Sequence, residues 1–300
     1  MVATVYEPGQ ESETATVPPM VRNVRLRELL VGIEGLALLR HLYDGEDADA
    51  ERRLAEVRRI VEEDAFAASE TMTEADPRAG YRAWSERYDE PGNPIIGLEE
   101  PVVWSITDTL PPGRALDAAT GTGRHAQHLA GQGHSVVGVD LTREMLRHAQ
   151  PVAGGAPALV EADLRRIPAA REAFDLVVCG LALAHVADLP GAVAELGRVL
   201  RPTGRLVVSV LHPFQACLGW HAPFEDADGQ RRFVREYPHS HADYVAAFAA
   251  AGLRVRGCKE PRLSIDAVQA KRRAFRHIPD ATVAAYADLP AVLVWDTEKA

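Results

Sequence analysis

The chain has 300 residues, of which 47% are hydrophobic and 25% are charged, and its formal net charge is −10 at pH 7. These proportions are typical of a globular protein, and the length predicts one large domain with an appendage. The acidic balance argues against a nucleic-acid partner. No apolar run approaches the roughly 18 residues of a membrane span. Three widely spaced cysteines favour reduced thiols, so we expect a cytoplasmic protein without a metal ion.

The first 77 residues predict an appendage. Residues 1–20 have acids and prolines where a signal peptide needs basic and then apolar residues, and they are predicted to be a disordered tail. Apolar residues then recur at helical spacing in two stretches, so residues 21–77 are predicted to be a helical hairpin followed by a polar linker. The first helix is too apolar to stand alone in water. It must pack on the main domain or on a second subunit, which would give a homodimer through these helices.

From Arg114 onward, short apolar runs alternate with helical stretches. This alternation indicates βαβ units and a parallel sheet that is covered on both faces. The fold class is therefore predicted to be α/β with a doubly wound sheet, in a domain of residues 78–300. Residues 212–240 and 261–289 depart from the pattern and are predicted to cap the substrate site. The predicted strands are residues 115–119, 135–140, 158–162, 174–179, 205–211, 253–258 and 291–295.

The first predicted strand ends in a turn that suits a ligand. Residues 116–124 read LDAATGTGR, so small residues and two glycines lead from a strand directly into a helix. A ligand can lie against such a backbone at the carboxyl edge of the sheet, where free N–H groups suit a carboxylate or a phosphate. Asp140 closes the next strand, where a carboxylate can accept both hydroxyls of a ribose; the alternative is an ordinary helix N-cap. These features predict nucleoside binding and would also fit an NAD enzyme.

Two further acids favour S-adenosylmethionine over a dinucleotide. Asp117 lies at the end of the first strand, where a dinucleotide-binding turn has an apolar residue. It can meet an ammonium group, which a methionine moiety has and a dinucleotide lacks. Asp163 follows the third strand and is placed to bond an adenine amino group.

Four segments together resemble the class I S-adenosylmethionine-dependent methyltransferases, especially the small-molecule group of ubiquinone and menaquinone biosynthesis. They are LDAATGTG (116–123), VVGVD (136–140), EADL (161–164) and FDLVVCGLALAHV (174–186). The resemblance implies a Rossmann-like sheet of seven mostly parallel strands with an antiparallel last strand, S-adenosylmethionine as the cofactor and S-adenosylhomocysteine as the product. The family usually has Gly and Cys at the positions of Ala119 and Thr120, and both replacements here are small.

The resemblance also assigns cofactor-binding residues. The turn would hold the methionine end of the cofactor. The second strand and the following helix would hold the ribose and one face of the adenine, and the end of the third strand would bind the adenine. The end of the fourth strand would lie below the sulfonium. In that order, these residues are Asp117, Ala119, Thr120, Gly121 and Gly123; Asp140, Leu141 and Met145; Ala162, Asp163 and Leu164; and Cys179, Gly180 and Leu181.

An aromatic helix and two histidines are candidates for the reacting end of the site. Residues 81–89 also resemble this group, in which an aromatic helix closes over the cofactor. Tyr81 and Tyr88 could contact the methionine carboxylate or the sulfonium; the alternative is a helix face packed on the core. His185 follows the fourth strand and His212 the fifth, and either could accept a proton from the acceptor. The alternative for each is a hydrogen-bonded pocket wall.

The sequence thus predicts a methyltransferase, with an O, N or C nucleophile of a small, partly apolar molecule as its acceptor. Aromatic side chains within residues 212–240 favour such an acceptor, for example a secondary metabolite. Three alternatives remain open: a peptide or protein methyltransferase, a non-catalytic nucleoside-binding protein, and an NAD(P)-dependent oxidoreductase. The last would give Asp117 and Asp163 no role.

Overall fold

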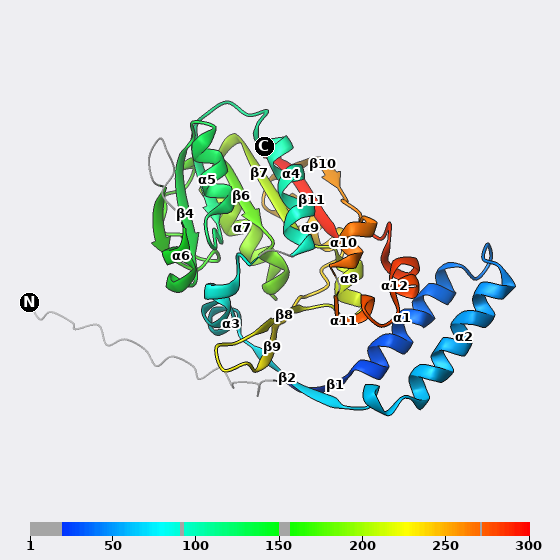
Figure 1. Cartoon of the computed structure of the whole chain (residues 1–300). Coiled ribbons are helices and arrows are strands. Elements are labelled where there is room, and N and C mark those ends of the chain that lie inside the picture. The colour runs from blue at the N-terminus through cyan, green and yellow to red at the C-terminus, as the bar shows by residue number, and fades with distance from the viewer. Residues whose placement is uncertain (1–19, 91–92, 150–156, 271) are drawn as a thin grey trace, which may run out of the picture.

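A seven-stranded sheet forms the centre of the computed structural model, which describes residues 20–90, 93–149, 157–270 and 272–300 (Figure 1). The strand order is β10-β11-β7-β6-β3-β4-β5. The pairs from β7 to β5 are parallel, and β11 is antiparallel to both of its neighbours. The predicted α/β class, the doubly wound sheet and the antiparallel last strand are confirmed. The strands are β3 (Arg114–Ala118), β4 (Ser135–Asp140), β5 (Ala158–Glu161), β6 (Phe174–Gly180), β7 (Leu200–Leu211), β10 (Leu253–Lys259) and β11 (Val292–Lys299).

Apolar side chains cover both faces of this sheet, because successive residues of a strand point to opposite sides. Leu116 and Val177 pack with α7 and α9 on one face. Their neighbours Ala115 and Leu176 pack with α4, α5 and α12 on the other. Burial of both faces explains why the strands are almost uniformly apolar. The helices around the sheet are α4 (Pro94–Thr107), α5 (Arg124–Gly131), α6 (Arg143–His148), α7 (Leu189–Val199), α9 (His241–Ala250) and α12 (Pro279–Tyr286).

A second sheet, which we call the cap sheet, joins the N-terminal segment to the insertion after β7. It has the order β1-β2-β9-β8. Residues 69–75 were expected to lie in a polar linker, but they form β2 and pair in parallel with β9. The sequence alone does not predict this strand, because its partner β9 lies far away along the chain. The strands are β1 (Val21–Arg25), β2 (Ser69–Ala75), β8 (Ala222–Glu225) and β9 (Arg231–Val234).

The predicted hairpin consists of α1 (Leu26–Arg40) and α2 (Asp47–Glu62), and it projects from the rest of the chain (Figure 1). Buried side chains such as Leu30 and Ile33 pack α1 against the main domain of its own chain. Arg40 donates hydrogen bonds of 2.8–3.0 Å to three carbonyls at the carboxyl end of α12, where the helix dipole favours a cation. The apolar face of α1 is thus largely covered without a second subunit.

Other parts of the appendage stay as predictions. Leu39, Leu42 and Tyr43 are exposed near the turn of the hairpin, and a homodimer through this region remains a prediction. Residues 1–19 of the predicted disordered tail lie outside the described residues. Within the described part of the chain, no helix is both long enough and apolar enough to span a bilayer. The described residues between 261 and 289 include the short helices α10 (Ile265–Gln269), α11 (Arg272–Phe275) and α12.

Candidate functional site

The turn after β3 meets the end of β4 at the carboxyl edge of the sheet. Ala119, Gly121 and Gly123 have φ angles of 60°, 56° and 86°, a region that strains residues other than glycine. The N–H of Gly121 donates to Asp140 Oδ2 at 2.8 Å, and the N–H of Thr142 donates to Asp140 Oδ1 at 2.8 Å. Asp140 therefore fixes the turn from the neighbouring strand and keeps a carboxylate beside it, although burial raises the pKa of this group.

Asp117 lies buried beneath the turn with one carboxylate oxygen unused. Its Oδ2 accepts hydrogen bonds from Thr120 Oγ1 at 2.6 Å and from the N–H of Ala126 at 2.9 Å. Its Oδ1 has no hydrogen-bond partner among the described residues. Burial raises the pKa of Asp117, and a buried acceptor without a donor costs free energy. An incoming ammonium group would satisfy this oxygen, so the residue fits the methionine end of S-adenosylmethionine.

The residues predicted around the adenine come together at the same edge. The N–H of Ala162 donates to the main-chain oxygen of Asp140 at 2.8 Å, and Asp163 pairs with Arg165 at 2.6 Å, which lowers the pKa of Asp163. Met145 is buried on α6, and a Cβ built on Gly121 would lie 3.4 Å from Met145 Cε. Leu141 and Leu164, next to these residues in the chain, are half-buried. The ends of three neighbouring strands therefore bring together the residues predicted to contact the nucleoside.

A buried ion-pair network, which the sequence analysis missed, lies between α4, α5 and β7. Glu99 on α4 accepts hydrogen bonds from Arg124, from Ser209 Oγ and, at 3.0 Å, from His125 Nε2. Trp104 Nε1–H donates to His125 Nδ1, so Nε2 is the nitrogen that donates to Glu99. Burial opposes ionisation of Glu99, but the donors His125 and Arg124 outweigh it and hold its pKa at about 2. Two adjacent glutamates within a mostly apolar helix were the available sequence signal.

The end of β6 packs directly on this network. Cys179 is buried, and burial raises the pKa of its thiol. A Cβ on Gly180 would lie 2.6 Å from His125 Nε2 and 2.9 Å from Arg124 Nη2. Leu181 has a φ angle of 54°, and its N–H donates to the main-chain oxygen of Ser209 at 2.8 Å. The protein's own side chains thus require glycine at position 180, and a bulky residue in a strained conformation follows it.

Substitution of Gly180 by alanine is expected to lower the free energy of unfolding by about 1–3 kcal/mol, because the added methyl group overpacks a buried site. Urea denaturation followed by circular dichroism measures this change. Gly257→Ala is the matched control, because a Cβ at that strand position meets nothing within 4 Å. A Gly180→Ala protein as stable as the wild type would contradict the packing described here.

At the other end of the site, the aromatic helix α3 (Pro77–Trp84) contacts His185, which lies in a short 3₁₀ helix, η3 (Leu183–His185). His185 Nδ1 lies 2.7 Å from the main-chain oxygen of Arg235, and a carbonyl only accepts, so Nδ1 carries a proton. His185 Nε2 then accepts the hydroxyl hydrogen of Tyr81 at 2.8 Å. Burial lowers the pKa of His185 to about 4. The imidazole is therefore neutral near pH 7 and presents its Nε2 lone pair toward α3.

The aromatic residues of α3, with Tyr88 just beyond it, form one packed group beside His185. Tyr81, Trp84 and Tyr88 contact one another with ring centroids 5.1–6.0 Å apart. Trp84 also stacks on Phe224 of the cap sheet at 5.6 Å. Burial raises the pKa of both tyrosines. Trp84 thus anchors the cap sheet, whereas Tyr81 directs its hydroxyl at His185.

Glu236, which the sequence analysis also missed, lies beside His185. Its Oε1 is 3.5 Å from His185 Nε2, and its side chain is 8% exposed. Its Oε2 has no hydrogen-bond partner in the described part of the chain, while its N–H donates to His221 Nδ1 at 3.2 Å. Burial raises the pKa of Glu236 to about 8, so the carboxyl group is largely protonated at pH 7. Nothing in the sequence singled out this glutamate, because its position depends on the pairing of β9 with β2.

Glu236→Gln is expected to gain stability over the wild type as the pH rises. Between the ordinary pKa of 4.5 and the folded pKa of about 8, the folded chain holds a proton that the unfolded chain releases, so wild-type stability falls through this window. Glutamine does not titrate, and the variant should gain about 3 kcal/mol on the wild type between pH 5 and pH 8. Urea unfolding across this range measures the difference.

The control for this experiment is Glu225→Gln, at an exposed glutamate in β8. This variant keeps Glu236, so its stability should fall with rising pH as that of the wild type does. A pH-independent difference for Glu236→Gln would mean that Glu236 ionises at an ordinary pKa.

His212, the other predicted base, is held by hydrogen bonds. Its Nδ1 accepts from the N–H of Phe214 and caps α8 (Pro213–Cys217), and its Nε2 lies 2.9 Å from Glu260 Oε1. His241 Nε2 lies 2.9 Å from the same oxygen. These three side chains are close enough to hold a metal ion, but a metal on His212 Nε2 would require a proton on Nδ1, facing the Phe214 N–H. The geometry favours the alternative for His212, a hydrogen-bonded pocket wall.

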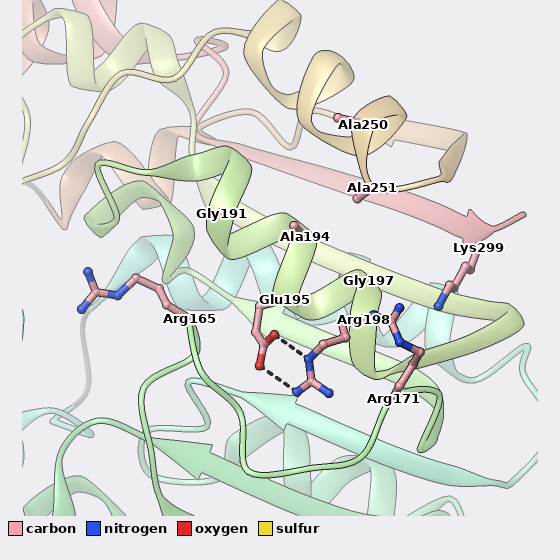
Figure 2. A pocket seen from close by; sticks show the side chains of 10 residues that line it. All are labelled: Arg165, Arg171, Gly191, Ala194, Glu195, Gly197, Arg198, Ala250, Ala251 and Lys299. Atoms are coloured by element: carbon pink, nitrogen blue, oxygen red, sulfur yellow. Dashed lines mark hydrogen bonds and ion pairs between the residues drawn. The ribbon is translucent and has the colours of Figure 1, made fainter. Parts of the chain in front are cut away.

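A groove of about 450 Å³ lies elsewhere, along α7 and the end of α9 (Figure 2). Two of its cationic side chains have partners within the chain: Arg198 pairs with Glu195 at 2.7 Å, and Lys299 Nζ donates to the main-chain oxygen of Leu200 at 2.7 Å. Leu200 begins β7, whereas His212 follows its carboxyl end. Lys299 therefore lies near the edge of the sheet opposite the candidate site, and the contacts of Arg198 and Lys299 tie neighbouring segments to this end of α7.

Comparisons with known proteins agree with this arrangement. The profile of the methyltransferase domain family matches residues 116–208. A demethylmenaquinone methyltransferase of Thermobifida fusca is 30% identical over 162 residues, which cover 48% of this chain and 68% of that protein. The corresponding protein of Beutenbergia cavernae is 33% identical over 147 residues, covering 46% and 60%. A methyltransferase structure from Mesorhizobium loti superposes with a TM-score of 0.51 at 21% identity, over 67% of this chain and 98% of that one, and shows the same fold.

The chain belongs to the class I S-adenosylmethionine-dependent methyltransferases, since its similarity to the Thermobifida protein extends over two thirds of that relative. S-adenosylmethionine is the cofactor of this family. The match to the first curated relatives spans only 24% to 60% of their length. The acceptor and the reacting residues must therefore be argued from the site itself.

Proposed function

We propose that the protein transfers the methyl group of S-adenosylmethionine to an O, N or C nucleophile of a small, partly apolar acceptor in the cytoplasm, as in secondary metabolism. The observation that carries this proposal is the buried neutral imidazole of His185, whose Nε2 faces the aromatic helix α3. The demethylmenaquinone methyltransferases among the relatives support a small-molecule acceptor. The unpartnered Oδ1 of Asp117 supports a methionine moiety over a dinucleotide.

Different residues of the chain bind different parts of the cofactor. Asp117 and the turn residues 119–123 hold the methionine end, and Asp140 holds the ribose hydroxyls. Residues 162–164, with Leu141 and Met145, enclose the adenine. Residues 179–181 lie below the sulfonium, and Tyr81 and Tyr88 cover it. When bound, the cofactor supplies a methyl group activated by its positively charged sulfur, so the protein mainly aligns the acceptor and excludes water.

His185 is the proposed base. The carbonyl of Arg235 keeps the proton on Nδ1, which leaves Nε2 to take up the proton of the acceptor, directly or through the hydroxyl of Tyr81. Aromatic side chains of the cap sheet, including Phe224 and Phe233, are buried near α3 and favour a partly apolar acceptor.

His185→Ala is expected to lower turnover at least about tenfold and to leave binding of S-adenosylhomocysteine nearly unchanged. Transfer of radiolabelled methyl groups to a panel of small phenols and amines measures turnover, and calorimetry measures binding. Because the pKa of His185 is about 4, protonation of His185 itself should lower wild-type kcat/KM only when the pH approaches this value. His128→Ala, at a histidine paired with Asp108 on the outer side of α5, is the control. A loss of less than about threefold for His185→Ala would remove this residue as the base.

A further inference from the structure

Glu236 carries a carboxyl group that neither the fold nor methyl transfer in general requires. It is buried, and its Oε2 has no hydrogen-bond partner in the described part of the chain. The neighbouring guanidinium of Arg235 is engaged elsewhere, in a two-point ion pair with Glu74 at 2.6 and 2.7 Å. Among the described residues, no Lys or Arg forms an ion pair with Glu236. Burial of an unpaired carboxyl group destabilises a protein, so a ligand that compensates it is the natural explanation.

The groups that face Glu236 are neutral and mostly aromatic. His185 Nε2 lies 3.5 Å away and accepts from Tyr81, and burial lowers the pKa of His185 and of His221. Tyr244 on α9 is close enough for a negative charge on Glu236 to raise the pKa of its phenol, which burial also raises. Ring faces attract cations, most strongly in a site that excludes water. A carboxyl group set among aromatic rings is therefore suited to an organic ammonium ion.

Building on the proposed function, we propose that the methyl acceptor is an amine and that Glu236 binds its nitrogen. A phenol or other hydroxyl acceptor brings no positive charge and would leave Glu236 protonated and neutral. An amine brings the charge that the site lacks, and its apolar part can contact the rings of Tyr81 and Trp84. Glu236 thereby determines specificity, and His185 remains the base.

Protons and electrons are balanced in this reaction. The amine binds as an ammonium ion opposite the Glu236 carboxylate, and the proton that Glu236 held goes to solvent. The ammonium ion loses one proton to His185 Nε2. The nitrogen lone pair then forms a bond to the methyl carbon while the carbon–sulfur bond breaks and its electron pair goes to sulfur. The product leaves as a methylated ammonium ion, and His185 returns its proton to solvent.

The test is calorimetric titration of the protein saturated with S-adenosylhomocysteine. The probes are benzylamine, phenethylamine and tryptamine, each paired with the corresponding alcohol. At least one amine should bind at least about tenfold more tightly than its alcohol, because only the amine forms a charge-assisted contact. Titrations at pH 7 in two buffers of different ionisation enthalpy should show release of about one proton for the amine and none for the alcohol.

The variants Glu236→Gln and Glu225→Gln complete the design. Glu236→Gln should abolish both the preference for the amine and the proton release, while retaining S-adenosylhomocysteine. Glu225→Gln, at the exposed glutamate of β8, should retain all three. The amine preference and the proton release are measured on the wild type, so they test the inference even if the Glu236 variant does not fold.

The proposal is overturned if no amine binds, if the alcohols bind as tightly as the amines, or if Glu236→Gln keeps the preference. Binding of S-adenosylhomocysteine without any preference for amines overturns the amine assignment alone. Failure of the wild type to bind S-adenosylhomocysteine overturns the proposed function itself.

Discussion

Replacement of Glu99 by alanine is expected to lower the free energy of unfolding by about 3–5 kcal/mol, the usual cost of removing one partner from a buried ion pair. Glu99 is fully buried and is the shared acceptor for Arg124, His125 and Ser209. Without it, the guanidinium of Arg124 keeps its charge in a largely buried position. Urea unfolding followed by circular dichroism measures the loss.

The control for this variant is its neighbour in sequence. Glu100 lies 3.6 Å from the same guanidinium but is partly exposed, so Glu100→Ala should cost less than about 1 kcal/mol. Equal losses for the two variants would mean that Arg124 interacts with both glutamates only through their charge and not through a specific buried contact. A loss below about 1 kcal/mol for Glu99→Ala would contradict the role of Glu99 as the shared acceptor of a buried network.

Asp140→Ala is expected to weaken binding of S-adenosylhomocysteine at least about 100-fold, because the carboxylate that we propose accepts the two ribose hydroxyls is lost. The same carboxylate holds the N–H groups of Gly121 and Thr142, so the glycine turn should also loosen. Titration calorimetry with S-adenosylmethionine, S-adenosylhomocysteine and NADPH measures the change. The wild type should bind the two adenosyl ligands and not NADPH.

Asp228→Ala, at an exposed aspartate in the β8–β9 turn, should bind as the wild type does. Unchanged affinity in Asp140→Ala would show that the nucleoside lies elsewhere. Binding of NADPH in place of the adenosyl ligands would mean that the turn after β3 is of the dinucleotide type.

The central sheet was predictable because its signals are local. Buried parallel strands are short apolar runs, and each lies between helices whose periodicity is visible in the same stretch of chain. The turn around Gly121 and Gly123 was predictable for a related reason, because positive φ angles favour particular residues. The nucleoside side of the site follows from these elements, since the carboxyl ends of parallel strands share one edge.

The acceptor side was less accessible to prediction. Glu99, Ser209 and Glu236 interact with residues far along the chain, and no spacing rule relates such positions. The cap sheet is the clearest case, because β2 is polar and its partner β9 lies in an insertion. For His212, the sequence suggested a role that the structure does not favour. Its position after β7 suited a base, and only the structure shows that its ring nitrogens are used in hydrogen bonds with Phe214 and Glu260.

The parallel pairing of β2 with β9 has a consequence for biosynthesis. A ribosome makes β1 and β2 early, but β2 gains its second neighbour, β9, only after the whole stretch through Val234 has been synthesised. Contacts that close such long loops form late, because chain entropy opposes them. The carbonyl of Arg235, which fixes the proton on His185, comes directly after β9. The nucleoside half of the site can therefore form on the nascent chain before the residues that would handle the acceptor's proton are in place.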